Sequence, residues 1–236
     1  MLTVLMSAKF RRRPMSFDAG VSSAGQLLIR LAEIDGFDQG WRIGDHVLSA
    51  DPSQNMDPVR ELQGPSVGST PFSFVVAQSP PGVQGLHANR PSYMIKVAYD
   101  DADGHLSVDV SFLPALADLD RVRALLVALA EWWPLQHVSV AERFYAREDS
   151  PLDPVNRLGI GWAGWIPFPL EPAQLPEAGH LEPLGSGTFL ASQNTYWEVT
   201  DRAAVQRAQD LELRLNALGL LPTRTVIKQG IWGDTP

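Results

Sequence analysis

Residues 64–68 have the residue types and spacing of a catalytic serine motif. They read G-x-S-x-G, the pattern around the serine nucleophile of α/β-hydrolases. That nucleophile needs a strand before the serine and a helix after it, so that the hydroxyl is exposed on a strained turn. Here polar residues precede the segment, and Pro71 follows too soon for a helix. We therefore interpret residues 64–68 as a turn.

The glycines of residues 159–164 have the G-x-G-x-x-G spacing of dinucleotide-binding loops. Such a loop must leave a strand and open a helix, because the first backbone N–H groups of that helix hold the pyrophosphate. Residues 154–158 make a poor strand, and Pro167 stands where the helix would run. The glycines instead predict a turn whose backbone packs closely against Trp162 and Trp165.

The candidate metal-binding patterns also lack residues that the known sites require. Residues 100–104 read D-D-A-D-G, but an EF-hand loop counted from Asp101 would have Leu106 at its sixth position and Phe112 at its twelfth, where glycine and glutamate are required. The five histidines are scattered, and cysteine is absent. We therefore predict no catalytic, no cofactor-binding and no metal-binding residue, and expect a protein that is not an enzyme.

The elements that would position these segments predict an α+β fold with a mixed, largely antiparallel sheet covered by amphipathic helices. Alternating or continuous apolar runs predict strands, and apolar residues spaced three and four apart predict helices. Asp103 and Gly104 predict a tight hairpin turn. The expected strands are 2–10, 42–48, 72–78, 93–99, 106–112, 138–145 and 187–192, and the expected helices are 16–34, a short one near 56–62, 117–133 and 201–218.

The helix ends carry recognisable signals. Ser16 and Thr200 are the expected N-caps, while Pro134 and Gly219 end the second and third long helices. The expected apolar face of the last helix consists of Ala204, Ala208, Leu211, Leu215 and Leu218.

Prolines and glycines concentrate in residues 147–185. This segment predicts either a division between two lobes near residue 150 or an irregular excursion packed on one sheet. The length of 236 residues fits one large domain or two small ones.

Charge and hydropathy restrict the function classes. A net charge of −8 argues against direct binding to nucleic acid, which depends on lysine and arginine contacts to phosphates. The positive charges of residues 9–13 follow the first apolar stretch rather than precede it, so no secretory signal is expected. No apolar run approaches the roughly 20 residues that span a bilayer. We expect a cytoplasmic protein that does not bind membranes.

Several short blocks together resemble a known family. They are the basic end of the first strand (10–13), the helix around 27–35 followed by Gly40-Trp41, the segment 161–165 (GWAGW), and the helix end 215–221 (LNALGLL). Their arrangement resembles the immunity protein 52 family of bacterial polymorphic toxin systems. The resemblance implies a single immunity-protein domain over residues 1–236 that binds and neutralises a cognate toxin. The toxins of this family are typically nucleases of restriction-endonuclease-like fold, often delivered by type VI secretion.

The acidic composition agrees with that implied role, because an inhibitor of a nuclease faces a basic substrate groove. Five acidic residues are the candidate contacts to the toxin, chosen for charge and expected exposure: Asp100, Asp101, Asp103, Glu148 and Asp149. Two alternatives stay open. One is a small-molecule hydrolase or transferase whose site is assembled from dispersed His, Asp and Glu in a deep pocket. The other is an adaptor that delivers the toxin without inhibiting it. The oligomeric state is not predicted.

Overall fold

A computed structural model describes most of the chain. The described residues are 4–13, 15–35, 37, 42–43, 46–47, 49, 54, 57, 72–78, 93–100, 105–111, 113–145, 149–153 and 156–233. Side chains at some strand positions, including the whole of 72–78, are outside this description.

Strands and helices follow one another along the chain much as the sequence predicts. In chain order they are β1 (Val4–Phe10), α1 (Phe17–Leu31), β2 (Arg42–Ile43), β3 (His46–Val47), β4 (Phe72–Gln78), β5 (Tyr93–Asp100), β6 (His105–Ser111), the 3-10 helix η2 (Pro114–Ala117), α3 (Leu119–Trp132), β7 (Leu135–Glu142), β8 (Ala163–Ile166), the 3-10 helix η4 (Pro172–Gln174), β9 (His180–Leu184), β10 (Gly187–Ala191), α4 (Arg202–Ala217) and α5 (Arg224–Gln229).

The strands form one sheet in the order β3-β2-β4-β5-β6-β1-β7-β8-β10-β9. All of these strand pairs are antiparallel, and β1 lies in the middle, between β6 and β7. The predicted α+β fold is confirmed. The same sheet continues through the proline-rich segment, because β7 pairs with β8 at Val138↔Trp165 and Ser139↔Gly164.

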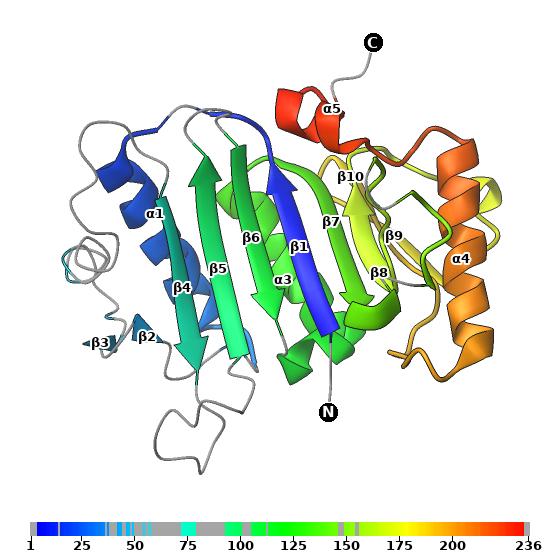
Figure 1. Ribbon diagram of the computed structural model, residues 1–236, viewed down its shortest axis with the longest axis horizontal. Helices are drawn as coiled ribbons and strands as arrows, with labels where there is room; N and C mark the ends of the chain where they lie inside the picture. The colour runs from blue at the N-terminus through cyan, green and yellow to red at the C-terminus, as the bar shows by residue number, and fades with distance from the viewer. Residues whose placement is uncertain are drawn as a thin grey trace.

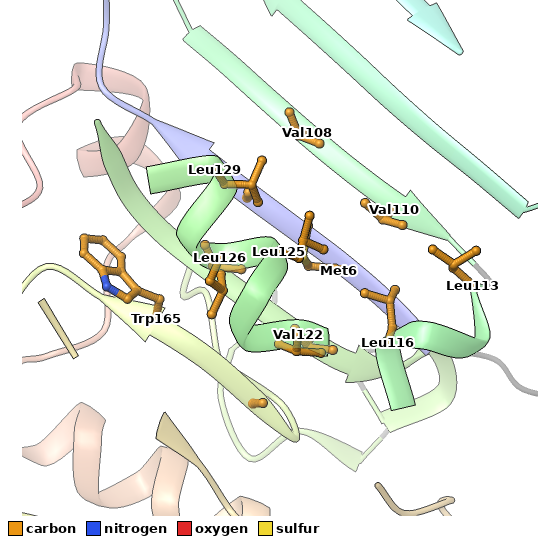
Figure 2. Packing of buried hydrophobic residues seen from close by; sticks show 14 of the residues in the cluster. Met6, Val108, Val110, Leu113, Leu116, Val122, Leu125, Leu126, Leu129 and Trp165 are labelled. Carbon is orange, nitrogen blue, oxygen red and sulfur yellow. The ribbon is translucent and has the colours of Figure 1, made fainter. Parts of the chain in front are cut away.

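Helices α1 and α3 cover one face of the sheet and lie behind it in Figure 1. Each begins at a capping side chain: Ser16 Oγ accepts from the Ala19 N–H at 3.3 Å, and an Asp118 carboxylate oxygen accepts from the Arg121 N–H at 3.1 Å. Figure 2 shows the apolar side of α3 facing β1 and β6. The residues of that contact are fully buried, among them Met6, Val108, Val110, Val122, Leu125, Leu126 and Leu129.

Strands β8 and β10 are buried on both faces. Successive side chains of a strand point to opposite sides, and here they join different clusters of the core. Trp165 and Phe189 belong to the cluster with α1 and α3, whereas Ile166 and Leu190 pack with residues of α4 such as Leu211. Helix α4 stands at this end of the sheet (Figure 1).

Several element boundaries differ from expectation. The last long helix is capped by Asp201, whose side chain accepts from the Ala204 N–H at 3.0 Å, and not by Thr200. Leu218 was expected on its apolar face but lies beyond its end, 42% exposed. The chain turns there because Gly219 adopts the left-handed conformation (φ 71°), as its position predicted.

Other differences concern short segments. The single strand expected at 42–48 is two strands of two residues that pair with each other, β2 and β3. Strand β7 begins at Leu135, earlier than predicted, and α1 ends earlier than predicted, at Leu31. Helix α5 and strands β8 and β9 were not predicted. The turn at Asp103-Gly104, most of the helix expected near 56–62, and residues 64–68 lie outside the described residues.

Candidate functional site

A polar cavity of about 220 Å³ opens on the sheet face opposite α1 and α3. One wall is formed by paired positions of β1 and β7, where Lys9 is opposite His137 and Ser7 is opposite Ser139. Directly opposite residues in an antiparallel pair project to the same side. The other walls come from residues 156–161, from α4 and from α5, so the cavity lies where the C-terminal segments reach the middle of the sheet.

Glu212 is a fully buried acid in this cavity. One carboxyl oxygen accepts from the Gly161 N–H at 2.8 Å, and the other accepts from the Tyr145 hydroxyl at 2.9 Å and the Ser150 hydroxyl at 3.0 Å. Burial raises the pKa of Glu212, and these hydrogen bonds oppose the shift. The residue joins α4 to the chain segments around 145–161, which are distant in sequence.

The Tyr145 hydroxyl is the donor in its hydrogen bond to Glu212. Burial, together with the neighbouring Glu212 carboxylate, raises the pKa of Tyr145. Its ring also packs edge-to-face on Trp197, with ring centroids 5.1 Å apart. Tyr145 and Ser150 therefore orient the Glu212 carboxyl group, and both hydroxyls use their protons in hydrogen bonds to it.

The histidine of the cavity is buried and neutral. Burial, with a smaller contribution from the charge on Lys9, lowers the pKa of His137 to about 3. Its side chain is 1% exposed, and its Nε2 has no hydrogen-bond partner among the described residues. A buried polar atom left in this way is uncommon and calls for an explanation.

Three basic side chains line the same cavity: Lys9, Arg157 and Arg224. Lys9 Nζ lies 3.7 Å from Asp109 Oδ1, and that carboxylate also accepts from the Ser7 hydroxyl at 2.5 Å. Arg157 uses one nitrogen to donate to the Leu221 carbonyl at 2.8 Å. Burial lowers the pKa of Lys9, Asp109 opposes this change, and the nearby charges of Arg224 and Lys96 add to it.

Taken together, these groups can hold a polar ligand through charge and hydrogen bonds. A nucleophilic serine needs a base within hydrogen-bond reach. The Ser150 hydroxyl has such a neighbour, since it donates to the Glu212 carboxylate at 3.0 Å, so the geometry is compatible with either binding or catalysis.

A second cavity, of about 600 Å³, lies on the other side of this region of the sheet. Trp165, Phe168, Leu184 and the prolines 167 and 169 supply much of its wall, and Arg11 supplies a basic group. It does not gather several ionisable side chains as the first cavity does.

Of the five acidic residues predicted as toxin contacts, only Asp149 has a described side chain. It is half-buried, and it accepts a hydrogen bond from Arg202 at 2.9 Å. Asp100 ends β5, but its side chain is not described, and Asp101, Asp103 and Glu148 lie outside the described residues. The structure therefore neither brings these residues together nor separates them.

The glycine-rich segment packs closely, but its glycines approach β7, Ile160 and Glu212 rather than Trp162 and Trp165 as predicted. Gly161 has a φ of 69°, and a Cβ atom there would lie 2.7 Å from the Val140 carbonyl oxygen. Trp162 and Trp165 are buried beside it. Among the described residues, no group of three or more acids and histidines has the geometry of a metal site.

The cavity itself was missed at the level of sequence. Glu212 lies between Leu211 and Leu215 on the apolar side of α4, and a charged residue in such a position signals a buried polar contact. The meeting of Lys9, His137 and Glu212 has no local signal, because the three residues are far apart in the chain.

No helix in the described part of the chain is both long enough and apolar enough to cross a membrane.

No family model and no curated protein matches the chain. Among solved structures, the fold is similar to that of a protein described as Pseudomonas aeruginosa T6SS protein PA0821, with a TM-score of 0.53. The two chains are 10% identical, and the match covers 91% of this chain and 76% of the other. At this identity the likeness shows a shared fold extending over nearly the whole chain.

Proposed function

We propose that this protein acts in type VI secretion as an immunity protein that binds and neutralises a cognate nuclease toxin. The observation that carries the proposal is the fold shared with a type VI secretion protein over 91% of this chain. The sequence blocks that resemble the immunity protein 52 family favour the same role, although no family model matches the chain.

The charge of the molecule fits this kind of partner. A nuclease binds a polyanion and needs a basic groove, and a protein with a net charge of −8 is attracted to such a surface. Long-range attraction mainly raises the association rate, which matters for an inhibitor that must capture a toxin before it cleaves DNA. Inhibition then follows either from covering the active site or from preventing assembly of the active toxin.

The test is reconstitution with the toxin encoded beside this gene. We expect the two proteins to co-purify and the complex to lose cleavage of plasmid DNA. Cleavage that persists with this protein in excess would refute the proposal. Cells that lack this protein should be killed by the toxin, whereas a delivery adaptor would leave them unharmed.

The predicted contact acids can be tested in the same system. Reversing the charge of Asp149 with lysine should slow association, and more at low than at high ionic strength, because salt screens the long-range attraction between the two proteins. Asp120→Lys, an equal charge change in the first turn of α3, is the matched control. Equal association rates for both variants would remove Asp149 from the interface.

The polar cavity gives a specific reason to keep a second candidate, a small-molecule hydrolase or transferase. A cavity that holds a buried acid of raised pKa near a buried histidine is a common feature of enzyme active sites. This candidate predicts turnover by the isolated protein, abolished by Glu212→Gln. The proposed immunity role predicts that Glu212→Gln still inhibits the toxin.

A further inference from the structure

The wall of the polar cavity combines several hydrogen-bond donors with basic side chains. Lys9, Arg157 and Arg224 enter it from β1, from the segment before β8 and from α5. The protein as a whole is acidic, so this grouping of bases runs against its overall charge. The cavity is also far larger than the roughly 10–15 Å³ that a single water needs.

The acids near these bases are already engaged. Glu212 directs its carboxyl oxygens to Tyr145, Ser150 and the Gly161 amide. Asp109 lies 3.7 Å from Lys9 and also accepts from Ser7. Burial is the main cause that lowers the pKa of Lys9; Asp109 opposes this change, and the charges of Arg224 and Lys96 add smaller contributions to it.

His137 supplies an independent observation. Its ring is 1% exposed, it lines the cavity, and Nε2 has no partner among the described residues. The neutral ring carries one N–H, and with that proton on Nε2 it would donate to a ligand oxygen. A ligand oxygen in the cavity would thus give this buried nitrogen a hydrogen-bond partner.

We propose that this cavity is a binding site for a small oxyanion, a carboxylate or phosphate group held by Lys9, Arg224 and His137. Arginine and lysine form charge-assisted hydrogen bonds with such groups, and these are stronger than bonds between neutral partners. The proposal is independent of the immunity role, since it concerns a ligand of the isolated protein.

The test follows the ring nitrogens of His137 by NMR during titration with sodium phosphate and with sodium malonate. Sodium chloride at the same ionic strength is the reference. We expect saturable shifts with phosphate, malonate or both, and none with chloride. Shifts that never saturate, or equal shifts with chloride, would overturn the proposal.

Arg224→Gln should weaken the apparent affinity about tenfold or more, the effect of losing one charge-assisted hydrogen bond. The change leaves the backbone contact of Arg224 to the Asn156 carbonyl in place. Lys228→Gln removes an equal charge from the same short helix, at a residue that does not line the cavity, and should change the affinity less than about twofold. Equal losses in both variants would show a diffuse charge effect and refute the site.

Lys9→Met provides a second variant, because methionine keeps much of the buried stem and removes the charge. Backbone spectra of each variant check that the fold is retained. If the site binds the free anions, repeating the titration on the complex with the toxin separates two sources of ligand. A lost response means that an acidic side chain of the toxin fills the cavity, and a retained response means that a free anion does.

Discussion

Strands β6 and β10 differ in what covers their two faces. On β6, Val108 and Val110 are buried beneath the helices, while Asp109 between them is partly exposed on the opposite face. On β10, every residue is buried, and the neighbours Phe189 and Leu190 belong to different core clusters. The difference arises because the C-terminal segments, including α4, cover the second face at β8 and β10 and reach as far as β7, whereas Asp109 on β6 stays partly exposed.

The cavity lies at the border between these two regions. Its wall on β1 and β7 belongs to the polar face, and its remaining walls belong to the segments that cover the other end. A sheet face that is partly covered places polar side chains in a sheltered but hydrated setting, where binding sites are commonly found. The C-terminal segments that cover this face therefore complete the second core cluster and also form the remaining walls of the cavity.

The largest expected effects come from substitutions on β10. Phe189→Ala should cost about 3–5 kcal/mol and Leu190→Ala about 2–5 kcal/mol of unfolding free energy, because both side chains are fully buried. On β6, Val108→Ala should cost about 1–3 kcal/mol and Asp109→Asn less than about 1 kcal/mol. Urea denaturation measures all four. A negligible cost for Leu190→Ala would mean that α4 does not stabilise the second face.

The connection between α4 and the glycine-rich segment depends on Glu212. Glu212→Ala leaves the Gly161 amide and two hydroxyls without this acceptor and should cost roughly 2–5 kcal/mol. Glu212→Gln is the matched control: its oxygen accepts from Gly161 and its NH₂ donates to the hydroxyl oxygens, so the loss should be below about 2 kcal/mol.

The same pair of variants has a pH signature. Because burial raises the pKa of Glu212 above its ordinary 4.5, the folded state holds this proton more tightly than the unfolded state. Wild-type stability should therefore fall as the pH rises from about 4.5 through the folded-state pKa. Glu212→Gln should remove that part of the slope, and an unchanged slope would contradict the assignment.

Gly219 and Gly161 both adopt the left-handed backbone conformation. Replacing each with alanine therefore separates the cost of backbone strain from the cost of a packing clash. Gly219→Ala should cost about 1–2 kcal/mol from backbone conformation alone, because no atom lies within 4 Å of the added Cβ. Gly161→Ala has the same conformational cost and also drives its Cβ against Ala141 and the Val140 carbonyl, so we expect roughly 2–4 kcal/mol. Thermal and urea unfolding measure the cost of each substitution. Equal costs would mean that β7 shifts to accommodate the added Cβ at position 161.

The last expected effect, which arises only in acid, is the pH sensitivity caused by His137. Its pKa is lowered to about 3, so the unfolded chain binds this proton more readily, and stability falls as the pH drops below about 6.5 toward 3. The contribution is at most about 1.4 kcal/mol per pH unit. His137→Gln should reduce the slope of unfolding free energy against pH by that amount, whatever its effect at neutral pH. An identical slope in the variant would show that folding does not lower the pKa of His137.

Local patterns in the sequence were sufficient for most of the sheet and the helices. The alternation around Val108 and Val110 located a half-covered strand, and Ser16 located the start of α1, because both depend on neighbouring residues alone. Short elements such as α5 and the pair β2 and β3 were missed or merged, because so few residues carry little periodic signal. The cap of α4 was misplaced by one residue, since Thr200 and Asp201 are both good capping types.

The sequence by itself determined an acidic α+β protein with a largely antiparallel sheet, since composition and hydrophobic period are properties of contiguous residues. It also marked Gly161 and Gly219 as turn positions, because only glycine adopts their backbone conformation without strain. The tertiary structure alone decided which polar residues meet. Lys9, His137 and Glu212 converge because antiparallel pairing sets β1 beside β7 and α4 closes over them, and such contacts between distant residues leave no pattern along the chain.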